Sequence, residues 1–196
     1  MKIDEYGCVV MEKDGTPGDL GDSCAESSRL DIIAPVHRHK LDLNAFVTAN
    51  GFVRHPKSPW REDDFSNDQA LPLILADYIR GAWWKIPGTN TIASPGVWAA
   101  VRGNWKLLAL TVKMQNLLFA LPYRWSDSKK WFERTSGSSA DYLNYFVSIV
   151  FLRRRGITVK MRPETLDKVR SYYANEPRSD WIVEAYLGAA ANEIRP

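Results

Sequence analysis

Two polar segments in the first third of the chain, residues 18–24 and 53–69, hold most of the side chains that are suited to chemistry. Asp22, His55 and Asp68 are the candidate catalytic residues. Two carboxyl groups in one cleft, one protonated and one ionised, can cleave a glycosidic bond, and an imidazole can assist proton transfer. Neither segment has the complete spacing of a catalytic or metal-binding motif, so this chemistry is one interpretation among several.

The same residues also have a structural interpretation. Asp22 or Ser23 is suited to cap a helix, because its side-chain oxygen can accept a hydrogen bond from a free backbone N–H group. Arg54 and Arg29 are suited to pair with Asp22 and Asp68 and so to join the two segments in a buried polar network. The sequence leaves open whether this cluster is a functional site or a structural network. Its members are Asp22, Arg29, His55 and Asp68.

Tryptophan is frequent, with eight in 196 residues. Aromatic rings stack on sugars, and aromatic and arginine side chains are enriched in the centres of protein–protein interfaces. We therefore predict that the tryptophans in and beside the loops form a binding surface together with Arg54. They are Trp60, Trp83, Trp84, Trp125 and Trp131.

No metal site or cofactor is predicted. His37 and His39 are two imidazoles without a third firm ligand, and the neighbouring Arg38 and Lys40 would repel a cation. The two cysteines, at positions 8 and 24, are too few for a thiolate metal site or a disulfide scaffold, so we expect free, buried thiols.

The elements that must position these side chains are helices. Residues 1–18 alternate weakly and contain a turn, which indicates a short extended arm. A helix is predicted from Asp22 or Ser23 to Ala34, before Pro35. Ser66 and Gln69 fit a capping box in front of the apolar run 70–84, with a kink or a late start expected at Pro72.

The second half of the chain carries the clearest helical signals. Residues 97–120 place large apolar side chains at three- and four-residue spacing, which predicts one long helix facing the core. Residues 141–152 predict a buried helix, ended by three arginines and by Gly156 in the C′ position. Two more helices are expected, from Pro163 to Asn175 and from Ser179 onward. The fold class is therefore all-α or predominantly α, with stacked antiparallel helical hairpins joined by long polar loops.

Composition indicates one ordered domain over residues 1–196, with 45% hydrophobic residues. Residues 1–70 hold 8 Lys and Arg against 13 Asp and Glu, so their net charge is −5 and the remainder of the chain carries +8. The basic residues are scattered apart from the run Arg153, Arg154 and Arg155, which disfavours nucleic acid as a partner. No apolar stretch has the length of a membrane span, and the first residues do not look like a signal peptide.

Several short motifs follow one another between residues 14 and 75: Gly-Asp-Ser with an arginine at position 29, Val-Arg-His-Pro at 53–56, Pro-Trp at 59–60 and Ser-x-Asp-Gln at 66–69. In this order they resemble a loose group of uncharacterised proteins of tailed bacteriophages. The Ser-x-Asp-Gln helix and the helical hairpins are also, more faintly, similar to six-hairpin glycoside hydrolases and lyases. The chain is too short for that fold and lacks a second placed acid, so no catalytic residue is carried over.

The resemblance implies a virion setting, with synthesis in the bacterial host cytoplasm. The leading hypothesis is a non-enzymatic structural protein of the tail, of the tail-fibre attachment or of the head decoration. Its expected partners are other virion proteins, in a homo- or hetero-oligomer. The alternative is a small carbohydrate-active enzyme or glycan-binding module that uses the polar cluster at residues 19–69 to contact a host surface glycan.

Overall fold

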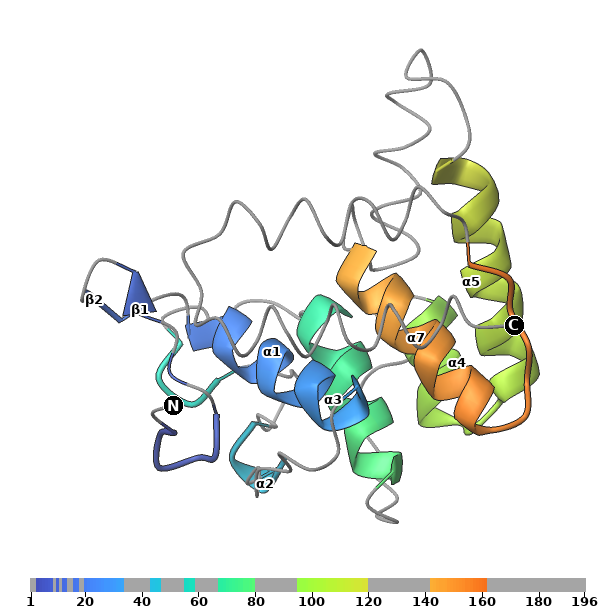
Figure 1. Ribbon diagram of the computed structural model, residues 1–196. Coiled ribbons are helices and arrows are strands. Elements are labelled where there is room, and N and C mark those ends of the chain that lie inside the picture. Colours follow the sequence, from blue (N-terminus) through green and yellow to red (C-terminus); the bar gives the residue numbers. More distant parts are fainter. Residues whose placement is uncertain are drawn as a thin grey trace.

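The computed structural model describes residues 3–8, 10, 12–13, 16–17, 20–33, 43–46, 55–58, 67–79, 95–119 and 142–161. These residues are mainly helical (Figure 1), which confirms the predicted fold class. The helices are α1 (Leu20–Ile33), α2 (Leu43–Phe46), α3 (Asn67–Ile79), α4 (Pro95–Val101), α5 (Trp105–Phe119) and α7 (Tyr142–Arg154). The predicted helices after residue 162 lie outside the described residues. None of the described helices is long and apolar enough to cross a membrane.

A small antiparallel pair of strands lies within the predicted extended arm. Strand β1 (Glu12–Lys13) pairs with β2 (Thr16–Pro17), with Glu12 opposite Pro17 and Lys13 opposite Thr16. In the described part of the chain these two strands form the whole sheet. The arm therefore pairs with itself and adds no layer to the helical core.

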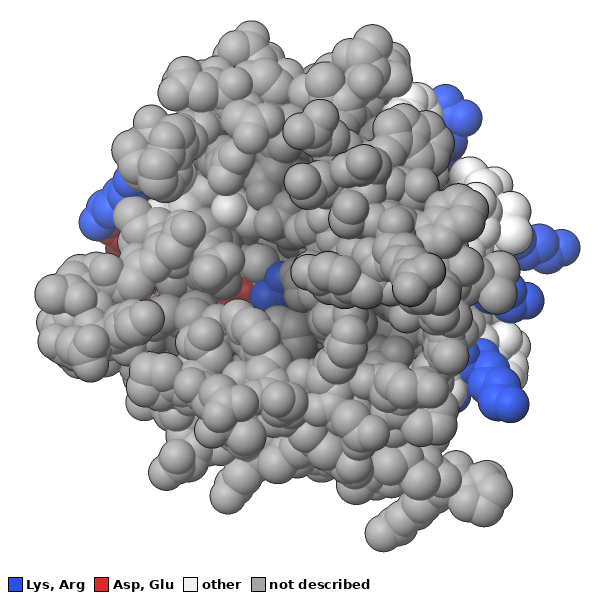
Figure 2. Space-filling view, turned by 90° about the horizontal axis from the view of Figure 1, so that it is seen from above, with Lys and Arg blue, Asp and Glu red and all other residues white. Residues whose placement is uncertain are grey.

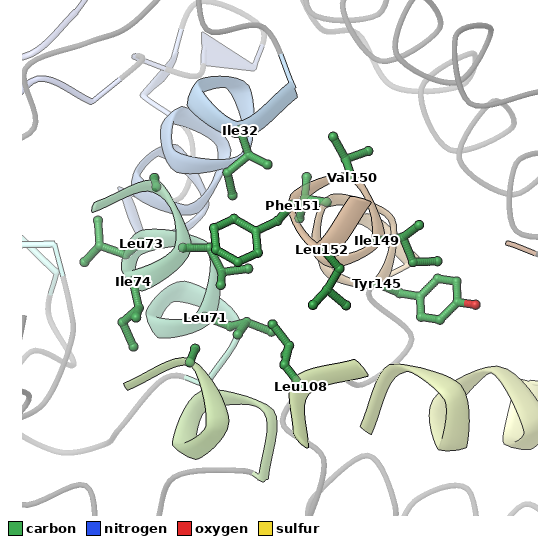
Figure 3. Packing of buried hydrophobic residues seen from close by; sticks show 14 of the residues in the cluster. Ile32, Leu71, Leu73, Ile74, Leu108, Tyr145, Ile149, Val150, Phe151 and Leu152 are labelled. Carbon is green, nitrogen blue, oxygen red and sulfur yellow. The ribbon is translucent and has the colours of Figure 1, made fainter. Parts of the chain in front are cut away.

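Three helices form the centre of the molecule. Helix α1 packs along α3, and α7 packs against α1, α3 and α5. Every residue in 25–33, 69–77 and 144–152 is buried, so these stretches of the three helices are covered on all sides. Figure 3 shows side chains of α1, α3, α5 and α7 meeting around Phe151. The largest completely buried side chains are Tyr145, Phe46, Phe146, Phe151, Leu30, Ile32, Leu73, Leu75, Leu108 and Ile149.

The single helix predicted over residues 97–120 is wrong, because the chain forms two helices there. Helix α4 ends at Val101, and Gly103 just beyond it has a left-handed φ of 61°. The N–H of Gly103 donates to the carbonyl of Ala100 at 3.0 Å, and that of Asn104 donates to the carbonyl of Ala99 at 2.8 Å. This pair of bonds is a Schellman motif, which terminates a helix. Asn104 Oδ1 then accepts the N–H of Leu107 at 3.1 Å and caps α5.

The predicted end of the buried helix α7 is confirmed. Gly156 has a φ of 73°, and its N–H donates to the carbonyl of Arg153 at 2.9 Å. The N–H of Ile157 donates to the carbonyl of Leu152 at 3.0 Å, which completes a second Schellman motif. Arg153 and Arg154 occupy the last turn, where cations favour the helix dipole.

The starts of α1 and α3 follow the predictions only in part. Helix α1 begins at Leu20, so Asp22 and Ser23 lie in its first turn and neither is the predicted cap. Helix α3 begins at Asn67, directly after the predicted cap Ser66, and continues through Pro72 without a late start. Gln69 Oε1 is buried and accepts no hydrogen bond among the described residues; Ser66 lies outside them, so the capping box stays a prediction.

Candidate functional site

Of the predicted catalytic residues, His55 is the one whose side chain is described. Asp22 lies on α1 and Asp68 on α3, and their side chains are outside the described residues. Arg54 and the predicted binding tryptophans are also outside them; these are Trp60, Trp83, Trp84, Trp125 and Trp131. The paired-carboxylate hypothesis and the tryptophan surface therefore stay predictions. The contacts of His55 are described.

The first element of this site is a tight turn around Asp4. Its Oδ1 accepts the backbone N–H groups of Tyr6 at 2.9 Å and of Cys8 at 2.8 Å. The N–H of Asp4 donates to the carbonyl of Cys8 at 2.9 Å, and Gly7 supplies the left-handed φ of 86° that closes the turn. The turn fixes one carboxylate oxygen of Asp4 and leaves Oδ2 to face another partner.

That partner is His55, which has no exposed surface. Its Nε2 lies 2.8 Å from Asp4 Oδ2, and its Nδ1 accepts the backbone N–H of Lys57 at 3.1 Å. Because Nδ1 accepts a hydrogen bond, the proton of the neutral ring belongs on Nε2 and is donated to Asp4. The ring packs edge-on against Tyr6 at 5.4 Å and Phe46 at 5.9 Å between centroids. The imidazole therefore joins the N-terminal turn, α2 and the turn at 55–58.

The third member is Cys8, whose thiol is buried and forms no disulfide, as predicted. Its sulfur, a carboxylate oxygen of Asp4 and a ring nitrogen of His55 all lie within 4.8 Å of one another. Burial alone would lower the pKa of His55, but hydrogen bonds and charge interactions with Cys8 and Asp4 outweigh it and raise that pKa above 6.5. The bond from the Lys57 N–H group to Nδ1 opposes a second ring proton and so favours the tautomer that is protonated on Nε2.

This Asp–His–Cys arrangement is not suited to nucleophilic catalysis. Neither Cys8 nor His55 has any exposed surface through which a substrate could reach the sulfur. What the cluster can do is hold the N-terminal segment in place or bind a small cation.

Sequence reasoning singled out His55 and noted Cys8, but it missed Asp4. Asp4 lies 51 residues before His55, and neither residue is in a regular element whose periodicity would orient it. The local signal was Asp4 three residues before Gly7. This spacing is typical of a turn in which the aspartate side chain accepts hydrogen bonds from the following backbone N–H groups.

A second polar group lies between α1 and α7. Arg29 Nη1 is 3.2 Å from Glu26 Oε2, and Arg29 Nε donates to Asn144 Oδ1 at 2.9 Å. All three side chains are almost completely buried. The side chains of Asp22 and Asp68, the partners predicted for the arginines from the sequence, lie outside the described residues, so that pairing stays a prediction beside the described contacts with Glu26 and Asn144. This group connects two inner helices.

Each of the arginines at the end of α7 has a structural partner. Arg153 Nη2 donates to the carbonyl of Val159 at 3.2 Å. Arg154 donates to the carbonyls of Ile32 and Ile33, the last two residues of α1. The bonds of Arg154 satisfy carbonyls that the end of α1 leaves without helical partners.

Arg155 lies over an aromatic cluster formed by three elements. Its guanidinium carbon is 4.3 Å from the ring centre of Tyr78, 5.3 Å from that of Phe151 and 5.4 Å from that of Trp105. Tyr78 and Trp105 pack edge to face, with centroids 4.6 Å apart. Cation–π contacts of this kind stabilise the corner where α3, α5 and α7 meet. The side chains of the arginine run therefore make contacts within the fold.

The outward side of α5 carries apolar residues that the core does not use. Leu107, Leu110 and Met114 are 37%, 53% and 48% exposed, and their spacing places them on one side of the helix. Exposed Lys106 and Lys113 lie along one edge of this stripe. We call these five residues the outer face of α5. On the side of α5, Figure 2 shows lysine and arginine beside uncharged residues, with no acidic residue in view among those described.

Sequence reasoning missed the outer face, although its signal was present. The predicted stripe through Trp105, Leu108 and Val112 was assigned to the core, and the structure confirms that Leu108 and Val112 are buried. Leu107, Leu110 and Met114 recur at the same helical spacing, displaced around the helix. One apolar stripe is enough to pack a helix against the core, so a second, exposed stripe indicates a contact with another surface.

Comparison of the chain with protein-family models, with curated proteins and with solved structures gives no match.

Proposed function

We propose that this chain is a non-enzymatic subunit of a larger protein assembly and that it docks on its neighbour through the outer face of α5. The observation that supports this proposal is the exposure of Leu107, Leu110 and Met114 on a helix whose opposite side is already buried in the core. Leaving three large apolar side chains in water costs free energy that a partner's surface would recover. The resemblance to proteins of tailed bacteriophages gives the first assembly to test, the virion.

The charge of this face selects the kind of partner. Lys106 and Lys113 flank the apolar stripe, and Arg102 near the start of α5 stacks on Trp98 at 4.0 Å. A protein surface with an apolar ridge bordered by carboxylates would be complementary to it, because opposite charges at the rim favour association and register. The proposed occupant is therefore a sister virion protein with an acidic rim.

Chemical cross-linking of intact virions followed by mass spectrometry tests the proposal, because lysine-reactive reagents report on Lys106 and Lys113 directly. We expect the chain at a symmetric copy number, with cross-links from these two lysines to carboxylate-rich segments of another virion protein. Its absence from the particle would overturn the virion setting. Presence in the particle with cross-links from other lysines alone would overturn the assignment of the outer face.

A matched pair of variants separates docking from folding. Leu110→Asp places a charge in the middle of the outer face and should abolish capture of the partner by the purified chain. Ile3→Asp changes an apolar residue of similar exposure, 43%, that lies far along the chain and should leave capture unchanged. Equal capture by both variants would contradict the proposal.

A further inference from the structure

The cluster at the N-terminal turn combines three types of metal ligand. Asp4 offers a carboxylate oxygen, Cys8 a sulfur and His55 a ring nitrogen, all within 4.8 Å of one another. Among the described residues this is the one group of three or more such side chains. Two of its members have no exposed surface, which distinguishes it from the acidic groups common on protein surfaces.

We propose that Asp4 Oδ2, Cys8 Sγ and His55 Nε2 bind one zinc-class divalent cation. Zinc takes sulfur, nitrogen and oxygen ligands in tetrahedral geometry, so three protein ligands leave one position for a water molecule or a further group. A thiolate disfavours Mg²⁺ and Ca²⁺, which prefer oxygen ligands. This assignment opposes the expectation from the sequence that the chain has no metal site.

Charge balance favours the cation in this buried position. When the metal binds, the Cys8 thiol proton leaves to solvent and the sulfur becomes a thiolate. The thiolate and the Asp4 carboxylate together carry a charge of −2, which neutralises a divalent cation. A neutral site avoids the large cost of placing an unpaired charge in a low-dielectric interior.

The turn around Asp4 already fixes the ligands in place. Oδ1 is held by the N–H groups of Tyr6 and Cys8, so Oδ2 is the oxygen directed at His55. Hydrogen bonds of this kind orient metal ligands and reduce the ordering cost of binding. The Asp4 side chain is 19% exposed, which gives a cation an entry path on that side.

Binding also has a local cost that makes it detectable. Coordination through Nε2 requires the ring proton to move to Nδ1, where the N–H of Lys57 now donates at 3.1 Å. That bond must break, and the turn at residues 55–58 must adjust. The amide signal of Lys57 should therefore shift when the metal binds.

Cobalt is the probe for this site, because Co²⁺ substitutes for Zn²⁺ and a cobalt–thiolate bond gives a near-ultraviolet charge-transfer band. We expect one equivalent of Co²⁺ to produce the band in the full chain, and Zn²⁺ to displace it. X-ray absorption of the zinc-loaded protein should show one sulfur in the first shell. A shell of nitrogen and oxygen alone, or no band, would overturn the proposal.

The two cysteines supply matched variants. Cys8→Ser should lose the band, whereas Cys24→Ser, which removes the chain's other thiol, should keep it. Asp4→Asn should weaken cobalt binding and retain the band at saturating metal. Circular dichroism checks that each variant is folded. If a variant does not fold, a second assay on the unaltered protein takes its place: bound Zn²⁺ should protect Cys8 from alkylation. Loss of the band in Cys24→Ser alone, or alkylation of Cys8 at the same rate with and without Zn²⁺, would refute the site.

Discussion

Helices α7 and α5 pack against each other and are both rich in apolar residues, but they are covered differently. Every residue from 144 to 152 on α7 is buried. Helix α5 buries Leu108 and Val112 and leaves Leu110 and Met114 in water. The apolar side chains of this stretch of α7 are all buried within the fold, whereas α5 keeps apolar side chains that are exposed to solvent. The comparison separates residues that stabilise the protein from residues available to a partner.

The largest expected effect follows from removing a side chain of α7. Phe151 has no exposed surface and packs against Trp105 with centroids 4.9 Å apart. Phe151→Ala should lower the free energy of unfolding by about 3–5 kcal/mol, because the lost burial leaves a cavity. Met114→Ala on α5 is the control and should cost less than about 0.5 kcal/mol. Urea denaturation measures both, and equal costs would contradict the comparison.

The end of α7 gives the next largest effect. Gly156→Ala should lower the free energy of unfolding by about 1 kcal/mol, because Gly156 has a φ of 73° that alanine adopts poorly. A methyl group there would meet nothing within 4 Å, so the cost is conformational and not steric. Gly156→Asn should lose less, since asparagine tolerates the left-handed region. Thermal unfolding ranks the three proteins, and an asparagine variant less stable than the alanine variant would refute the explanation.

The third effect is a gain in stability on replacing a buried carboxylate of α3. Burial raises the pKa of Asp77 on α3 above 3.8, and Oδ1 of this carboxylate accepts no hydrogen bond among the described residues. The folded state then binds the Asp77 proton more tightly than the unfolded state, so ionised Asp77 destabilises the fold at neutral pH. Asp77→Asn should raise the free energy of unfolding at pH 7 by at most about 1 kcal/mol, because the amide stays unpaired.

The pH dependence identifies the cause. Stability of the unaltered protein recovers as pH falls through the raised pKa, so the advantage of Asp77→Asn should shrink when pH is lowered toward 3.8. Unfolding free energies at pH 7 and near pH 4 measure this change. An advantage of the same size at both values would show that desolvation of the carboxylate is not the reason.

The smallest effect is expected on the outer face. Leu110→Asp should change the free energy of unfolding by no more than about 0.5 kcal/mol, since Leu110 is 53% exposed. Leu108→Asp, two positions earlier and 1% exposed, should destabilise the protein by several kcal/mol, because it buries an unpaired charge. Thermal unfolding compares them, and a strongly destabilised Leu110→Asp would assign that residue to the core.

The sequence predicted the inner parts of the fold better than its boundaries and corners. The stripe of α5 and the buried run of α7 follow from apolar periodicity and hydropathy, which act locally. Gly103 terminates α4 and Asn104 caps α5. These two residues are the whole sequence signal for the break, and the apolar stripe continues across it. The break therefore depends on local caps that periodicity does not report.

The candidate metal cluster was less predictable, for a different physical reason. His55 and Cys8 were noted separately, and Asp4 was not, because the three meet only after tertiary folding. Their segments have no helical period that would place them on a common face. The exposed apolar residues Leu107 and Leu110 were readable from spacing, but sequence alone does not say which of two stripes the core covers.

The bonds from Arg154 to the end of α1 also constrain the order of events during synthesis. This arginine is translated more than a hundred residues after the carbonyls of Ile32 and Ile33 that it binds, and Asn144 is similarly distant from Arg29. Helix α1 thus leaves the ribosome long before Asn144 and Arg154 exist, whereas Asp4 and His55 can meet early. A nascent chain stalled before α7 should hold an ordered N-terminal turn and an unfinished α1, which makes α7 the segment whose release completes folding.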